Sequence, residues 1–406
     1  MTKRVVITGV GLVSALGDSP ELLFQALVEG RTAQKPIQGF DTTGLNSRNS
    51  AAIGTFVEKT YLGVKNMRPF DRTARLVLAA AKLATDNAGL NVEALRRHEA
   101  GLVLGTMFCS VRTIAEFDRR AITAGVEYAS VMDFANSVIN AAAGQTAIWY
   151  GLRGLNATIC GGVASGLQAL AYGADMIRLG RSKVLLVGGG EEFSYEGLVG
   201  FERAGWLAVP EERAVPFDKR RNGLLLGEGA ALLMMEEAEF AAARGTRALA
   251  EIRGASIGFD RSRGKDPAES AAALARSIRA ALAEANLSPA DIGLLSASAS
   301  GSVAADRAEA NGVAAALNGR CASLPVTAVK SMLGETVGAG GTLQTVAAMQ
   351  AMESGMLPGI VGLEETETDF PLAQAHPATR AVQAETALVT SVSLDGNCCA
   401  LVLGRL

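Results

Sequence analysis

Short apolar runs bounded by glycine alternate along the chain with alanine-rich segments of helical period. The runs predict buried strands at residues 4–10, 100–105, 183–190, 229–235 and 293–297. Apolar positions three and four apart predict covering helices at residues 73–88, 165–178 and 269–285. Because strands and helices alternate, the pattern predicts an α/β fold with parallel sheets. The last twenty residues alternate around a glycine turn and predict a closing hairpin.

One unit of this pattern occurs twice. The helix predicted at residues 76–88 and the strand that begins at Gly101 resemble the helix at 273–285 and the strand that begins at Gly293. The repetition predicts two related halves packed as one body, because no low-complexity linker separates them. The predicted halves are residues 1–250 and 251–406.

Composition narrows the classes of function. The chain has 406 residues, 49% hydrophobic and only 5% aromatic, with 46 glycines, which is typical of small side chains packed on buried strands. A net charge of −3 argues against nucleic acid or an anionic membrane as a partner. No apolar run reaches the ~18 residues of a membrane span, and the first residues lack a signal-peptide pattern, so we expect a cytoplasmic protein.

Cysteines and glycines indicate neither a metal nor a cofactor. The five cysteines are odd in number and lack metal-site spacing, which favours buried thiols in a reduced compartment. Gly9, Gly11 and Ser14 follow the first strand, but the third glycine and the later acidic residue of a dinucleotide fingerprint are missing. A tight turn is the preferred interpretation.

Five ordered segments carry a resemblance to a known family. They are VVITGVGLVSALG near the start, GLRGLNATICGGVASGLQAL from Gly151, VPFDKRRNGLLLGEGAALLMMEE from Val215, VKSMLGETVGAGG from Val329 and the terminal SVSLDGNCCALVL. Together they resemble the β-ketoacyl synthases over essentially the whole chain. The resemblance implies a thiolase-like fold, layered αβαβα with two pseudo-symmetric halves.

In that family a cysteine at a helix N-terminus attacks an acyl thioester, and two histidines act in decarboxylation and enolate stabilisation. Alignment with the family motifs places Val163 at the cysteine position and Ser298 and Glu335 at the histidine positions. The chain has only two histidines, His98 and His376, and both lie outside these motifs. The resemblance therefore implies that condensation chemistry is absent.

Other members of the family site are retained. Asp306 and Glu309 keep the spacing that follows the first histidine, and Lys330 opens the segment of the second. The resemblance implies a buried charged network, for which a structural role is favoured over a catalytic one. Leu394 stands where active members carry a phenylalanine gate.

A ketosynthase scaffold without its chemical groups resembles the chain length factors of type II polyketide systems. These pair with an active ketosynthase, and each subunit lies at the far end of its neighbour's acyl tunnel. By family position, Met107, Phe108, Met132 and Asp133 are expected at that tunnel end or interface, although ordinary interface packing explains them equally well. Lys65, Arg68 and Arg72 are candidate contacts for an acidic acyl carrier protein, or simply a solvated helix face.

Two alternatives remain open. One is a thiolase-fold acyltransferase or decarboxylase that uses Cys160, which lies three residues before Val163. The other is a homodimeric protein that sequesters an acyl chain or carrier without a partner synthase. The residues do not specify the pathway, which can be aromatic, reduced, polyene or fatty acid biosynthesis.

Overall fold

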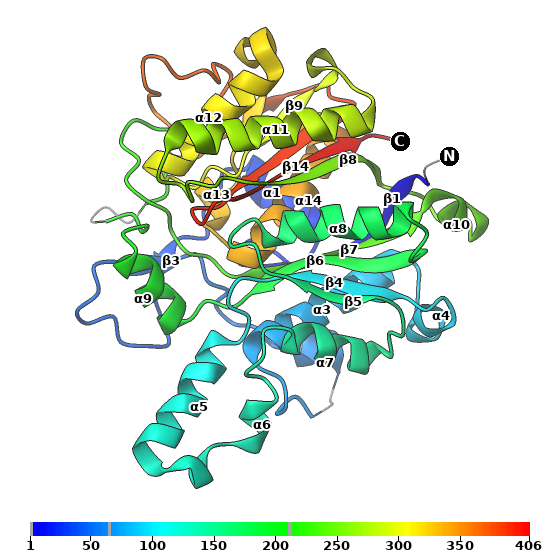
Figure 1. Ribbon diagram of the computed structural model, residues 1–406, viewed down its shortest axis with the longest axis vertical. Helices are drawn as coiled ribbons and strands as arrows, with labels where there is room; N and C mark the ends of the chain where they lie inside the picture. Colours follow the sequence, from blue (N-terminus) through cyan, green and yellow to red (C-terminus); the bar gives the residue numbers. More distant parts are fainter. Residues whose placement is uncertain (1–2, 64–65, 210–212) are drawn as a thin grey trace.

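The computed structural model describes residues 3–63, 66–209 and 213–406, and one ten-stranded mixed sheet runs through them (Figure 1). Its strand order is β10-β9-β13-β14-β8-β1-β7-β6-β4-β5. The first five strands along the chain are β1 (Val5–Ser14), β4 (Gly101–Gly105), β5 (Asn156–Ile159), β6 (Val184–Glu191) and β7 (Gly229–Glu237). The second five are β8 (Ala250–Phe259), β9 (Leu294–Ser296), β10 (Val326–Thr327), β13 (Thr386–Val392) and β14 (Asn397–Gly404). All five predicted strands and the closing hairpin are confirmed.

The sheet consists of two runs of strands with matching order. The run β1-β7-β6-β4-β5 corresponds to β8-β14-β13-β9-β10, and β1 and β8 join the runs by antiparallel pairing, with Val5 opposite Ile252. In each run the three outer strands are parallel and the two inner strands are antiparallel to their neighbours. The boundary at residue 250 stays a prediction.

The prediction of parallel sheets was therefore wrong for β1, β7, β8 and β14, because each of them pairs antiparallel with both of its neighbours. β13 and β14 are joined by only four residues, and such a short connection permits only antiparallel pairing. The β1 strand pairs antiparallel with both β7 and β8. Apolar runs indicate burial on both faces but carry no information on strand direction.

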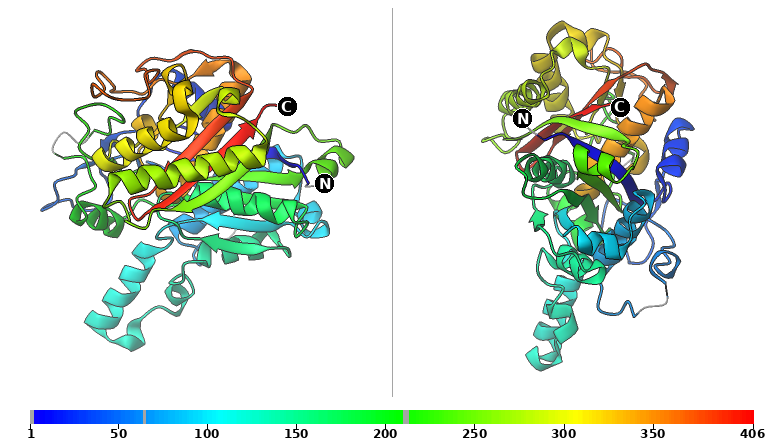
Figure 2. Two further views of the ribbon diagram at one scale, coloured as in Figure 1. Left: turned by 45° about the horizontal axis from the view of Figure 1, so that its top comes forward. Right: turned by 90° about the vertical axis from the view of Figure 1, so that its right-hand side faces the viewer.

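Helices cover and separate the strands in the αβαβα arrangement (Figures 1 and 2). α8 and α14 form the middle layer, because each contacts strands of both halves. The other main helices cover the outer faces, α3 and α7 on one side and α11 and α12 on the other. These helices are α3 (Arg72–Asn87), α7 (Ala141–Tyr150), α8 (Ser165–Arg178), α11 (Pro267–Ala285), α12 (Val303–Leu317) and α14 (Gly340–Ser354). The three predicted helices are among them.

Shorter elements complete the chain. The further helices are α1 (Pro20–Val28), α2 (Lys59–Leu62), α4 (Val92–Arg97), α9 (Tyr195–Arg203), α10 (Ala238–Ala243) and α13 (Lys330–Leu333). Two small ribbons pair β2 (Lys35–Pro36) with β3 (Asn49–Ser50) and β11 (Met356–Leu357) with β12 (Arg380–Ala381). Single 3₁₀ turns are η1 (Val126–Tyr128), η2 (Pro289–Asp291), η3 (Asn318–Ala322) and η4 (Val337–Ala339). No helix of the described ranges is long and apolar enough to cross a bilayer.

The first glycine cluster serves packing between β1 and α3. A Cβ at Gly11 would lie 2.1 Å from the carbonyl oxygen of Ala80, and one at Gly9 would lie 2.5 Å from that of Ala84. Only glycine lets the helix backbone approach the strand this closely. These glycines therefore have a structural explanation that involves no nucleotide.

One segment projects away from the layered body. It comprises α5 (Val111–Ala124), η1 and α6 (Val131–Phe134), and we call residues 111–139 the arm (Figure 2). No residue of α5 or α6 is buried. The arm keeps apolar side chains in contact with solvent, and it begins six residues after β4 ends.

Candidate functional site

The position expected for a nucleophile is occupied by an apolar side chain. Val163 lies two residues before α8 begins and is 7% exposed. It belongs to an apolar cluster that also contains Met107, Phe108 and Leu394. The structure thus brings together four residues singled out from the sequence, and none of them can form a thiolate.

The backbone beside Val163 is already hydrogen-bonded. The Val163 N–H donates to the Ser393 hydroxyl oxygen over 3.2 Å. An N–H at a helix N-terminus is a donor for a developing oxyanion when it is free. Here a side chain of the terminal hairpin accepts that hydrogen bond.

A small cavity lies beside Phe108, within the same apolar cluster as Val163. It is lined by Phe108, Phe201 and Val337, among others, and has a volume of about 10 Å³, which is at most the space of one water molecule. The Phe108 and Phe201 rings meet edge to face with centroids 6.0 Å apart. An acyl chain has no room in this cavity, whereas Leu394 of the same cluster lines a separate pocket of about 370 Å³.

Ser298, which the alignment places at the first histidine position, has its backbone N–H and its hydroxyl hydrogen-bonded. Its backbone N–H and its hydroxyl donate to Glu309 Oε1 over 2.8 and 2.9 Å. The hydroxyl oxygen accepts from the Val392 N–H at 3.0 Å, and Thr390 donates to the same Glu309 oxygen at 2.6 Å. The Ser298 hydroxyl thus links the Glu309 carboxylate to the terminal hairpin through these two hydrogen bonds.

Glu335, which the alignment places at the second histidine position, forms a buried ion pair. Its Oε2 lies 2.7 Å from Lys330 Nζ, and its Oε1 accepts the Val337 N–H at 3.0 Å. The Glu335 and Lys330 side chains are 1% and 2% exposed. Burial raises the pKa of Glu335, and the Lys330 charge opposes that shift and also acts on Glu309. Lys330 thus acts on Glu335 and on Glu309, the carboxylate that Ser298 contacts.

Asp306 supports the same region from α12. Its carboxylate accepts the backbone N–H groups of Phe217, Ser300 and Gly301 over 3.0 to 3.1 Å. Complete burial raises the pKa of Asp306 to about 6 despite these hydrogen bonds. Its contacts are those of a residue that holds loops in place.

The two histidines lie on other elements. His98 caps the C-terminal end of α4 and meets the Phe240 ring edge to face. His376 lies in an exposed loop, where its Nδ1 contacts Ala378. Neither ring belongs to the Val163 cluster.

Cys160 follows the last residue of β5 and is exposed. Partial desolvation of the thiol, and next the charge of Glu191, raise its pKa. A thiolate is therefore disfavoured there, in contrast to the activated thiols of catalytic cysteines.

The remaining predicted residues lie apart from this cluster or at its edge. Met132 and Asp133 belong to α6 of the arm. Arg68 is exposed, whereas Arg72 forms an ion pair with the buried Glu228. Lys65 lies outside the described residues. Carrier-protein contacts remain a prediction.

Two acidic residues at the end of β6 were not singled out from the sequence. Glu191 accepts the Met107 and Phe108 N–H groups at 2.7 and 3.0 Å and so positions the loop after β4. Its neighbour Glu192 lines both the small cavity beside Phe108 and a larger pocket. The available signal was a pair of carboxylates directly after a buried strand, where burial needs a specific partner.

Comparison with known proteins places this architecture. The family model described as Beta-ketoacyl synthase, N-terminal domain, matches residues 2–241, and the one described as Beta-ketoacyl synthase, C-terminal domain, matches residues 249–364. The chain is 28% identical over 410 residues to the 3-oxoacyl-[acyl-carrier-protein] synthase 2 of Vibrio harveyi, covering 100% of this chain and 99% of that protein. It is 31% identical to Nodulation protein E of Rhizobium sp. (strain N33), with 98% of each covered.

Solved structures of ketosynthase-type proteins superpose on the whole chain. A structure described as the ishigamide ketosynthase/chain length factor superposes with a TM-score of 0.93 at 30% identity, with 100% of each chain covered. A β-ketoacyl synthase from Burkholderia phymatum STM815 also superposes with a TM-score of 0.93, at 28% identity and with 100% of each chain covered.

Proposed function

Since the chain belongs to the β-ketoacyl synthase family, we propose that it is a non-catalytic chain length factor that pairs with an active ketosynthase. In this role it shapes the acyl tunnel of its partner in type II polyketide, polyene or fatty acid biosynthesis. The observation that carries the proposal is Val163, a buried valine at the position that the alignment gives to the nucleophile, in an apolar cluster whose cavity at Phe108 holds only about 10 Å³.

The two former histidine positions support the same conclusion. Ser298 has its hydroxyl engaged with Glu309 and Val392, and Glu335 is paired with Lys330. A carboxylate at the place where an enolate would develop opposes that charge. Full-length relatives include synthases named for catalysis, so the proposal depends on Val163, Ser298 and Glu335 and not on the fold.

An exposed apolar surface supports pairing with another subunit. The arm and α7 present large apolar side chains to solvent, among them Val131 at 86% and Ile148 at 82%. The others are Ile122, Val126, Tyr128, Met132, Phe134, Val138 and Ile139. Several large apolar side chains exposed on neighbouring elements are typical of protein interfaces.

The sheet ends close to this surface. β5 is an edge strand whose other side pairs with β4, and it contacts α7. An open edge offers backbone hydrogen bonds to a second chain. We infer that the arm, α7 and β5 form the heterodimer interface, with Met132 and Asp133 facing the partner's tunnel.

Co-expression tests the proposal. The chain is expressed alone and together with a ketosynthase that retains cysteine and two histidines, and condensation is assayed with malonyl and acyl carrier protein thioesters. We expect no activity from the chain alone, and a stable complex whose products differ in length from those of the ketosynthase alone. A chain that condenses by itself, or that leaves product length unchanged in a formed complex, would refute the proposal.

The same assay separates the alternatives. An acyl adduct that disappears in Cys160→Ser would establish an acyltransferase. The raised pKa of the Cys160 thiol disfavours the thiolate that this activity requires. Persistent homodimers that ignore the ketosynthase would instead indicate a sequestering protein.

A further inference from the structure

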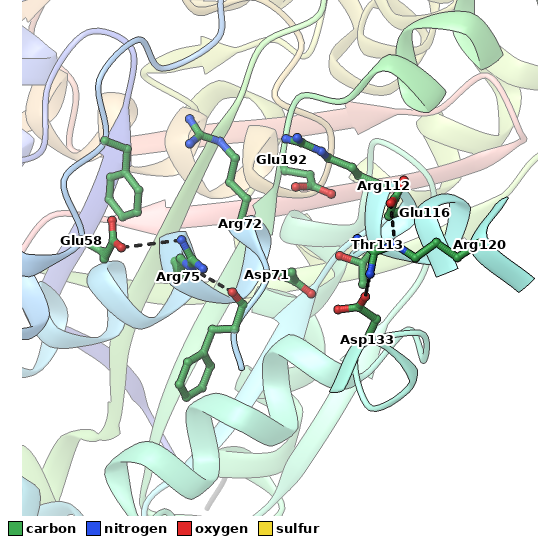
Figure 3. A pocket seen from close by; sticks show the side chains of 12 residues that line it. Glu58, Asp71, Arg72, Arg75, Arg112, Thr113, Glu116, Arg120, Asp133 and Glu192 are labelled. Carbon is green, nitrogen blue, oxygen red and sulfur yellow. Dashed lines mark hydrogen bonds and ion pairs between the residues drawn. The ribbon is translucent and has the colours of Figure 1, made fainter. Parts of the chain in front are cut away.

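A second pocket lies between the arm and the layered body (Figure 3). Its volume is about 390 Å³, far larger than the cavity beside Phe108. The arm contributes Arg112, Thr113, Glu116, Arg120 and Asp133, and the body contributes Phe56, Glu58, Phe70, Asp71, Arg72, Arg75 and Glu192. The pocket is therefore lined largely by charged groups.

Three of the four arginines in the lining are neutralised within the chain. Arg72 pairs with Glu228, and Arg75 Nη1 lies 3.6 Å from Glu58. Arg120 donates to Glu116 at 2.7 Å and lies 3.6 Å from Asp133. These three guanidinium groups already have carboxylate partners within the chain, so none of them requires a ligand for its charge.

Glu192 and Arg112 differ from the other charged groups. Glu192 is 7% exposed, and its Oε1 makes no hydrogen bond. The described residues offer Arg112 neither a hydrogen bond nor an ion pair, and its guanidinium acts on Glu192 only through its charge. A buried polar atom without a hydrogen bond costs free energy that a bound group can recover.

A neutral ligand group fits this pair better than a charged one. Asp71, one of the carboxylates that already act on Glu192, also lines the pocket and would oppose a carboxylate ligand, and an ammonium would meet Arg112. Burial, and next the charge of Asp71, raise the pKa of Glu192 to about 8, so its carboxyl offers a donor as well as an acceptor. A hydroxyl or carboxamide can accept from Arg112 and hydrogen-bond to Glu192 at once.

We propose that Arg112 and Glu192 bind a hydroxyl or carboxamide at the far end of the acyl chain that the partner ketosynthase extends. The inference rests on the proposed function, and it assigns to the complex a starter unit with a neutral hydrogen-bonding end. Arg112 is the second residue of the arm, at the inferred interface, and Glu192 also lines the cavity beside Phe108. A chain that arrives from the partner along the arm would meet these two residues.

The isolated chain tests the site itself. Binding of benzamide, phenol, toluene, benzoate and benzylammonium is measured by ligand-observed NMR. We expect benzamide and phenol to bind at least tenfold more tightly than the other three, and Glu192→Leu and Arg112→Met each to weaken them about tenfold. Glu192→Gln should retain binding, because the amide keeps a donor and an acceptor. Glu93→Leu and Arg97→Met, an exposed pair on α4, are matched controls that should change nothing.

Equal binding of toluene, or preference for either charged probe, would overturn the site, as would unchanged binding in Glu192→Leu. The complex tests the substrate assignment through the ratio of turnover for hydroxyl-ended and methyl-ended starter thioesters. Arg112→Met should lower that ratio about tenfold, and an unchanged ratio refutes the assignment. If no complex forms, the proposed function fails, and probe binding by the isolated chain still decides whether the site exists.

Discussion

The Lys330 ammonium lies 2.7 Å from the Glu335 carboxylate in an interior that almost no solvent reaches. Removal of one member of such a pair leaves the other charge uncompensated, whereas joint replacement by apolar groups is tolerated. The pair therefore explains how the Glu335 carboxylate can be buried at this position.

We expect Lys330→Met to lower the free energy of unfolding by about 3 kcal/mol, because Glu335 and Glu309 then lose their shared cation. The double variant Lys330→Met/Glu335→Leu should recover most of that loss. Urea denaturation measures both. Arg405→Met removes an exposed pair with Glu385 and should cost less than about 1 kcal/mol. A single variant as stable as the wild type would contradict the interpretation.

Glu192 should make stability depend on pH. Its folded pKa of about 8 lies above the ordinary 4.5, so its contribution is complete below pH 4.5 and is lost as the pH rises through 8. The groups that act on it are Asp71, Glu191 and Glu228, with Arg112 in opposition. Glu191, whose pKa burial raises to about 7, adds to the same trend.

Glu192→Gln should therefore reduce the fall in unfolding free energy between pH 5 and 8 by about 2 to 4 kcal/mol. Denaturation midpoints across that range provide the measurement, with Glu93→Gln on α4 as the control. Parallel curves for Glu192→Gln and the wild type would show that the carboxyl is ionised in the folded chain throughout.

Phe108 should limit product length in the complex. Its ring packs against Phe201 beside the nearly closed cavity, so Phe108→Ala opens space toward the interface. We expect products at least one extension unit longer by mass spectrometry. Phe370 belongs to residues 251–406, and its ring packs on Phe217. Phe370→Ala is the control and should leave product length unchanged. Identical products from Phe108→Ala would place the limit elsewhere.

The arm should govern assembly. Val131 is 86% exposed, so Val131→Asp should leave the unfolding free energy within about 0.5 kcal/mol of wild type. Burial of that charge in an apolar interface should weaken association with the ketosynthase at least tenfold. Analytical ultracentrifugation of the mixture measures the change. Leu179→Asp, at the exposed end of α8, is the matched control. Undiminished association would remove the arm from the interface.

Several features of the site could be predicted because they depend on local order in the sequence. The spacing from Ser298 to Asp306 and Glu309, and from Lys330 to Glu335, lies within single motifs. Ser393 was not predicted, because its contact with the Val163 N–H joins residues 230 positions apart. The Arg72–Glu228 ion pair was missed for the same reason, since it joins α3 to a loop 156 residues later. Strand direction was also missed, because it depends on connections rather than on apolar pattern.

The sequence by itself determined which chemical groups stand at the three aligned positions. Val163, Ser298 and Glu335 carry neither a thiol nor an imidazole whatever surrounds them, and the two histidines lie outside the motifs. Tertiary structure alone decided what those positions do instead: Val163 fills an apolar cluster, Glu335 neutralises Lys330, and Glu192 is buried next to the arm. The reason is that side-chain identity sets the available protons and charges, whereas burial and partners are set by segments that meet only when the chain folds.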